Sequence, residues 1–223
     1  MKKRVLITIF CILLLNFAFG QTEVKSDSKL NYELIVILDT IHTNDQKYRE
    51  KMDEIAEKYG LQSNEMKEIW NTMHVTDSIN LIKVKKIIDE NGWLGSDVIG
   101  EQGNKTLFLV IQHSDLNTQI TYLPILREAV KKNNAKASHL ALLEDRTALS
   151  HGKKQVYGSQ IGQDQKTGEY YIFPIEDPDN VDKRRAEVGL EPISEYLKTW
   201  NLKWDVKKHK AIIKETEKNK KTP

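Results

Sequence analysis

Apolar residues recur at the spacing of one helix face along most of the chain. The first such segment covers residues 28–59, and its apolar positions follow the i, i+3, i+4, i+7 pattern: Leu30, Leu34, Ile37, Leu38 and Ile41. Asp27 or Ser28 is the expected N-cap, and Gly60 is a left-handed stop. We therefore predict one long helix that ends at Tyr59 and buries a single stripe.

Helical spacing continues to about residue 150. We predict further helical segments, separated by a glycine-containing loop at residues 92–100 and by short polar turns. Their approximate bounds are 63–91, 106–111, 118–132 and 136–150. Thr76 and Asp77 mark a candidate break in the first of them. The second is apolar all round, which indicates a buried helix.

Beyond residue 152 the spacing changes from helical to alternating. Gln155, Tyr157 and Ser159 point one way in this pattern, and a run of strand-forming residues follows at 170–173. We predict a β-hairpin over about residues 154–175, packed on the helices because an isolated hairpin is only marginally stable in water. The predicted fold is mainly α: a single-domain helical bundle with one β-hairpin near the C-terminal third.

The first 20 residues have a pattern of their own. Three basic residues precede an apolar run, residues 5–19, which is short for a membrane span and ends in small-x-small residues. We predict a signal peptide over residues 1–20 and export to the periplasm or the exterior, with no stable membrane span after cleavage. The alternative is an uncleaved amino-terminal anchor. Residues 21–27 are interpreted as a linker, 28–202 as the domain and 203–223 as a basic tail.

Composition narrows the classes of function. Without the leader the chain has 31 Lys plus Arg against 32 Asp plus Glu, so it is close to neutral. Its only cysteine, Cys11, lies in the leader, which excludes disulfides, thiolate metal sites and cysteine nucleophiles from the mature chain. The basic end has no Arg and few aromatics, so we interpret it as a frayed helix and solvated tail and expect no nucleic-acid partner.

Two polar clusters are the candidates for a functional site. The first is Gln112-His113-Ser114-Asp115, which directly follows the buried run, where polar side chains are costly unless they are hydrogen-bonded. The second, residues 145–160, crowds an acid, a guanidinium, an imidazole, two carboxamides and a phenol around the change of pattern. The two clusters are expected to form opposite walls of one site.

These residues resemble a widespread bacterial family that is catalogued only as a domain of unknown function. The likeness covers roughly residues 30–200, and Leu94 departs from it where the family often has proline. Its motifs are Gly92-Trp93, Gly100, Gln112-His113-x-Asp115, Leu143-x-Asp145-Arg146, Gln155-x-Tyr157-Gly158-Ser159-Gln160, Pro174-Ile175-Glu176-Asp177 and Val181-Asp182-x-Arg184-Arg185-x-x-x-Gly189-Leu190. The resemblance supports a common site and implies no particular chemistry.

His113 has two interpretations. In one it is a general base of a cofactor-free hydrolase or lyase, with Asp115 or Asp145 holding its tautomer and Arg146 stabilising developing negative charge. In the other it is a buried, hydrogen-bonded histidine at the end of a helix. The neighbouring Gln112 adds a further directional group to either arrangement.

The amides and the phenol of the second cluster also have two interpretations. Gln155, Tyr157 and Gln160 can bind a small polar ligand or a protein partner through hydrogen bonds. Alternatively they join Asp145, Arg146 and three residues of the first helix in a buried polar network that is purely structural: Asp45, Gln46 and Arg49. We favour the pocket slightly, because such a network is a costly route to stability alone.

Other chemistries are less well supported by the spacing. The histidines and carboxylates are the right types for a metal site, but no two histidines sit four residues apart and no His-Glu-x-x-His is present, so no metal and no cofactor is predicted. Ser114, Ser150 and Ser159 lack the Gly-x-Ser-x-Gly setting of a nucleophilic serine. Arg184 and Arg185 are expected to serve helix capping and an ion pair.

Overall fold

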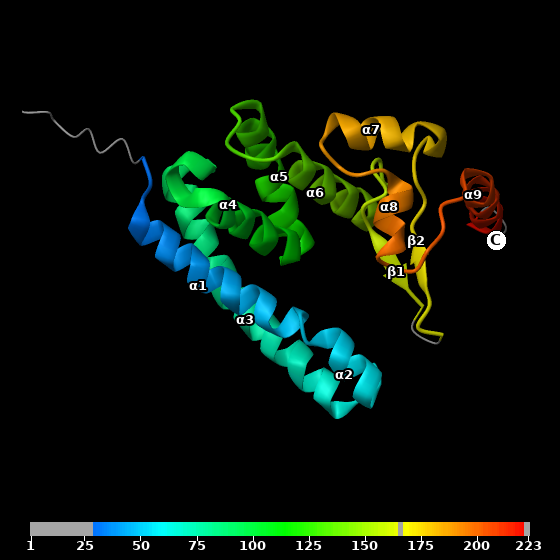
Figure 1. Cartoon of the computed structure of the whole chain (residues 1–223), viewed down its shortest axis with the longest axis horizontal. Helices are drawn as coiled ribbons and strands as arrows, with labels where there is room; N and C mark the ends of the chain where they lie inside the picture. Colours follow the sequence, from blue (N-terminus) through cyan, green and yellow to red (C-terminus); the bar gives the residue numbers. More distant parts are fainter. Residues whose placement is uncertain (1–28, 165–166, 221–223) are drawn as a thin grey trace, which may run out of the picture.

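A computed structural model describes residues 29–164 and 167–220 of the chain (Figure 1). The elements in order are α1 (Tyr32–Arg49), α2 (Met52–Tyr59), α3 (Asn64–Asn91), α4 (Ser96–His113), α5 (Leu116–Lys131), α6 (Ala137–Ser150), β1 (Ile161–Gln163), β2 (Tyr170–Ile172), the 3-10 helix η1 (Pro178–Asn180), α7 (Val181–Glu187), α8 (Ile193–Lys198) and α9 (Val206–Lys220). The predicted mainly α fold with one hairpin is confirmed. The predicted leader, and the capping residues Asp27 and Ser28, lie outside the described residues.

The first predicted helix is two helices. The Asn31 side chain accepts a hydrogen bond from the Leu34 N–H and caps α1, and the chain breaks at Glu50 and Lys51 before α2 begins. The turn tightens there, because the Lys51 N–H donates to the carbonyl three residues back instead of four. Neither glycine nor proline marks this break, so the apolar spacing continues across it unchanged.

The next two helices also differ from their predicted bounds. α3 continues without a break through Thr76 and Asp77. α4 begins at Ser96, inside the expected loop, because Gly100 adopts a positive φ of 70° and lets the helix continue after a kink. α3 and α4 pack against α1, and α1 and α3 run side by side along one edge of the molecule in Figure 1.

The hydrophobic interior is divided into two clusters. The larger cluster lies among α1, α3, α4, α5 and α6, with the fully buried Leu107 and Ile111 of α4 among its members. The smaller one is formed by Ile175, Val181, Ile193 and Leu197, beneath the hairpin and the short helices that follow it. In Figure 1, α6 lies between the helices that form the larger cluster and the elements that form the smaller one.

The hairpin is shorter than predicted. Ile161 pairs with Ile172 and Gln163 with Tyr170, whereas Gln155–Gln160 is an irregular loop and not a strand. In that loop only Gln155 forms a bridge, which is parallel, to Ile175. The alternation that we interpreted as a strand therefore has another cause, because this loop is shaped by hydrogen bonds to buried side chains that are described below.

The basic C-terminal segment includes a docked helix. His209 and Ile213 of α9 are buried, and the His209 Nε2 accepts a hydrogen bond of 3.1 Å from the Ile175 N–H. His209 thereby joins α9 to the smaller core. Within the described part of the chain, no helix combines the length and the apolar character that crossing a membrane requires.

Candidate functional site

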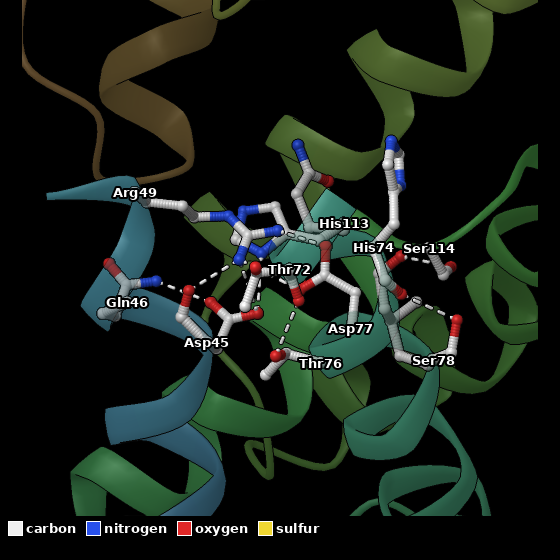
Figure 2. Close-up of polar contacts among 12 residues, drawn as sticks. Asp45, Gln46, Arg49, Thr72, His74, Thr76, Asp77, Ser78, His113 and Ser114 are labelled. Atoms are coloured by element: carbon white, nitrogen blue, oxygen red, sulfur yellow. Dashed lines mark hydrogen bonds and ion pairs between the residues drawn. The ribbon is translucent and has the colours of Figure 1, made fainter. Parts of the chain in front are cut away.

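An aspartate and a histidine meet where α1 and α4 lie together. The His113 Nδ1 is 3.0 Å from the Asp45 Oδ1, and the Asp45 side chain is buried (Figure 2). Because an ionised carboxylate can only accept, Nδ1–H is the donor, so Nε2 is the acceptor whenever the ring carries a single proton. The Gln46 Nε2 donates to the other carboxylate oxygen, at 2.6 Å. The imidazole therefore has a fixed orientation.

An arginine and a second aspartate lie beside this pair. The Arg49 guanidinium makes a two-pronged contact with Asp77 of α3, at 3.0 and 2.7 Å, and also donates to the Asp45 carbonyl at 2.6 Å. One guanidinium nitrogen is 3.4 Å from the Asp45 carboxylate. α1 and α3 are thus joined next to His113, as Figure 2 shows.

These groups border a small cavity. Its volume is about 220 Å³, and its lining comes from α1, α3, the end of α4 and the start of α5. The lining residues are Asp45, His74, Asp77, Ser78, Leu81, Val110, His113, Ser114 and Asp115. Pockets for drug-sized ligands usually enclose about 300–1,000 Å³, so this one suits a smaller molecule.

The charge state of Asp45 follows from its surroundings. Burial raises the pKa of its carboxyl, but the hydrogen bond from His113 and the charges of His113 and Arg49 together lower it by more, so the pKa lies below its ordinary value. Asp45 is accordingly an anion at neutral pH. It can both fix the tautomer of the imidazole and stabilise the imidazolium when the ring gains a proton.

Asp115 and Asp145, the carboxylates expected to orient His113, have other partners. Asp115 caps α5: its oxygens accept from the Thr118 N–H at 3.0 Å and the Thr118 hydroxyl at 2.7 Å. Hydrogen bonds from Thr118 also lower the pKa of Asp115. The expected pairing is therefore wrong, and Asp45 takes that role, although Asp115 still lines the cavity.

Asp145 is fully buried and holds the loop that follows α6. Its carboxylate accepts from the backbone N–H groups of Val156, Tyr157 and Ser159, at 2.6, 3.0 and 2.9 Å. Three converging N–H groups are a strong site for a carboxylate. They explain why the loop turns around this side chain and does not extend as a strand.

Arg146 connects that loop to the end of α4. Its Nε donates to the Gln160 Oε1 at 3.1 Å, and its Nη1 donates to the Gln112 carbonyl at 3.0 Å. Burial lowers the pKa of Arg146, and the nearby charge of Arg49 lowers it further. The two predicted clusters are thus joined at Gln112, but through a backbone carbonyl and not across a shared cavity.

The amide of Gln155 is used inside the protein. Its Nε2 donates to the carbonyls of Gln160 and Phe173, at 3.2 and 2.9 Å, and its Oε1 accepts from the Gln160 N–H at 2.9 Å. The Tyr157 carbonyl accepts from the buried Arg185, at 2.8 Å. Gln155 and Gln160 therefore belong to the internal network through their side chains and Tyr157 through its backbone, while Asp45 lines the His113 cavity and Arg49 lies beside it.

Three polar cavity residues, all on α3, were not anticipated from the sequence: His74, Asp77 and Ser78. Asp77 was interpreted as a break because polar residues interrupt the apolar spacing there. The available signal for Asp77 was an acidic side chain on the inner side of one predicted helix, with a basic residue, Arg49, on the neighbouring predicted helix. Arg184 makes the expected ion pair, with Asp177 at 3.5 Å, but it caps no helix end: it donates to the loop carbonyls of Val156, Glu176 and Asp177.

One buried polar atom lies next to the site without a partner in the described part of the chain. The buried Gln112 Oε1 has no hydrogen bond within the described residues. Across residues 29–164 and 167–220, no group of three His, Cys, Asp or Glu side chains is arranged to hold a metal ion. The cavity lining presents imidazole, carboxylate and hydroxyl groups.

Comparison with known proteins gives one match. Residues 30–209 match the family model DUF6624, described as a family of unknown function. The match covers most of the chain, which therefore belongs to this family. Neither the curated proteins nor the solved structures contain a match.

Proposed function

We propose that this DUF6624 protein binds a small polar molecule in the cavity at the junction of α1, α3 and α4. The observation that carries the proposal is the buried Asp45 carboxylate, which fixes the His113 ring while that ring still lines the cavity. A histidine that served only to fill space would not need an ionised orienting partner. We expect its Nε2 to be the central recognition group.

The charges of the lining narrow the class of ligand. Three carboxylates border the cavity, and the Arg49 guanidinium beside them is already paired with Asp77. Such a lining repels anions and favours a neutral or cationic ligand that has hydroxyl or amine groups. Ser78 and Ser114 add hydroxyls that can donate or accept.

A second candidate function is catalysis with His113 as general base. An aspartate on Nδ1 is the arrangement that orients a catalytic imidazole and stabilises its protonated form. In this proposal Nε2 takes a proton from a ligand hydroxyl or a water molecule, and Asp45 replaces Asp115 and Asp145 as the orienting acid. Arg146 is already engaged with Gln112 and Gln160, so it does not act on the reacting group.

A thermal-shift screen tests binding. Its compounds are amines, amino alcohols, polyols and small cell-wall fragments, and we expect a subset to raise the melting temperature of the wild type. His113→Ala should abolish that shift and keep the fold. His151→Ala is the matched control, because His151 is exposed at the end of α6 and is not among the cavity residues. If no compound shifts the wild type, or if His113→Ala binds equally well, the binding proposal fails.

Asp45→Asn separates the two candidates. For a binding protein it should weaken affinity modestly. For an enzyme it should lower the turnover of a bound compound by about a hundredfold or more, because the amide favours the wrong tautomer. Product formation by mass spectrometry is the measurement, and a bound compound that the wild type leaves unchanged argues for binding alone.

A further inference from the structure

The outer face of α3 carries large apolar side chains that no other part of the described structure covers. Val75, Ile79 and Ile82 are 62%, 50% and 71% exposed. Their spacing of four and three residues places them in one row on the helix surface. The opposite side of α3 contributes Val84 and Ile88 to the larger core, so the helix already has its interior face. Single exposed apolar residues are normal, but an aligned row indicates a contact surface.

α1 widens this surface. Val36 is 66% exposed, and with Ile37 it borders a groove of about 510 Å³ between α1 and α3. Lys83 and Lys86 of α3 line the same groove. The apolar row on α3 and the groove are therefore neighbouring parts of one surface along the two helices that Figure 1 shows side by side.

Exposed charges of opposite sign lie on the same face of α3 as the apolar row. Glu65 and Glu68 lie towards the start of α3, and Lys83 and Lys86 lie towards its end. At 3.6 residues per turn, these four and the three apolar residues fall within an arc of about 100°. Both charged pairs have a spacing of three residues, and both are equally distant from the point between Val75 and Thr76, where the apolar row begins.

We propose that two copies of this chain associate through this face of α3, with the two helices antiparallel. A two-fold axis beside Val75 places Glu65 of one copy opposite Lys86 of the second copy, and Glu68 opposite Lys83. The contact is self-complementary, as a two-fold dimer requires. A parallel arrangement brings like charges together instead, so the charges select the antiparallel one. This inference does not rest on the proposed function, because the cavity lies on another side of α3.

Analytical ultracentrifugation over a wide range of protein concentration tests the proposal. We expect the purified protein to reach twice the monomer mass. Ile82→Glu should weaken association by about tenfold or more, because it buries a charge at the contact. Ile212→Glu is the matched control: Ile212 is also half exposed, but it lies on α9. Circular dichroism confirms that both variants are folded.

Charge exchange tests the orientation. Glu68→Lys and Lys83→Glu should each weaken the dimer, and the double variant should regain most of the loss, because the pair is restored with its signs reversed. A protein that stays monomeric at every concentration overturns the proposal. So does a dimer that Ile82→Glu leaves intact, and a double variant that associates no better than the two single variants overturns the antiparallel arrangement.

Discussion

Asp145 has no contact with solvent. Its buried carboxylate is stabilised by the backbone N–H groups that surround it. The carboxylate satisfies three of these groups in a loop that has little regular structure. An unpaired buried N–H group costs about 1–3 kcal/mol, so one side chain determines whether the whole loop can be buried. At the scale of single residues, Asp145 of α6 thereby sets the path of the loop that follows it.

Asp145→Ala is therefore expected to lower the free energy of unfolding by about 3–5 kcal/mol, because it leaves the buried N–H groups of Val156, Tyr157 and Ser159 without an acceptor. Urea denaturation measures the change. Asp53→Ala, at an exposed position in the first turn of α2, should cost less than about 1 kcal/mol. A loss below about 1 kcal/mol in Asp145→Ala would show that the loop is held by other contacts.

His139 makes the protein sensitive to acid. Its ring stacks on Phe108 with centroids 4.3 Å apart, its Nδ1 is buried without a partner in the described structure, and burial lowers its pKa from 6.5 to about 4. As pH falls from 6.5 to 4, the unfolded chain binds a proton at His139 and the folded chain does not, so stability is lost in that window. Above it this contribution is constant.

The wild type should accordingly lose about 1–3 kcal/mol more than His139→Phe between neutral pH and pH about 4. The variant keeps an aromatic ring on Phe108 and cannot titrate. Parallel urea titrations across this pH range give the difference. Equal acid sensitivity of the two proteins would assign the loss to other groups.

The residue types of the candidate site were predictable, but their partners were not. His113 and Asp145 were recognisable because directional polar groups crowd beside apolar runs. The Asp45–His113 pair joins positions 68 residues apart, and it depends on how α1 lies against α4. No local pattern indicates that packing. The sequence therefore pointed to Asp115, which is close to His113 along the chain, as the orienting acid, and this prediction was wrong.

At the scale of elements, Gly158 fixes the path of the loop between α6 and β1. Its φ is +68°, and an added Cβ would lie 2.6 Å from the Ile193 Cδ1 and 2.7 Å from the Ile175 Cδ1. Both isoleucines belong to the smaller core. The position therefore requires glycine for its backbone conformation and also for the space beside it.

Gly158→Ala should cost about 3 kcal/mol, the sum of left-handed strain and overpacking. Gly168→Ala isolates the first effect, because Gly168 has a φ of +73° with no atom within 4 Å of the added Cβ, and it should cost only about 1 kcal/mol. Thermal unfolding of both variants measures the two costs. Similar losses would mean that the two isoleucines move aside easily.

Apolar spacing predicted the helices well because most of them bury one face. It did not predict the break at Glu50 and Lys51, because both residue types are readily accommodated in a helix. It also failed between Gln155 and Gln160, where alternating side chains suggested a strand. In that loop the conformation is set by Asp145, a residue outside the segment, and local preference is overridden by tertiary hydrogen bonds.

At the scale of the whole molecule, two hydrophobic clusters are connected through α6 and its polar side chains. Arg146 reaches the end of α4 on one side and Gln160 on the other. The larger cluster is made by helices near in sequence, and the smaller one needs the loop, the hairpin and the last helices together. Stability should therefore differ between the two halves.

Arg146→Met tests this connection. The substitution keeps much of the side-chain volume but leaves the Gln112 carbonyl and the Gln160 Oε1 without their donor, so we expect a loss of about 2–4 kcal/mol. Hydrogen exchange should accelerate in residues 155–175 more than in α1, α3 and α4. Arg127→Met, which removes a half-exposed ion pair with Glu144, should change stability by less than about 1 kcal/mol. Uniform acceleration throughout the chain would instead indicate a single cooperative unit.

The backbone groups that surround Asp145 also set an order of events during synthesis. When α6 leaves the ribosome, the residues that will donate to its carboxylate follow 11 to 14 positions later. Until they arrive, the carboxylate stays hydrated, while the earlier helices can already pack. We therefore expect the last third of the chain to fold onto helices that have already packed, with Asp145 as the first point that holds its backbone.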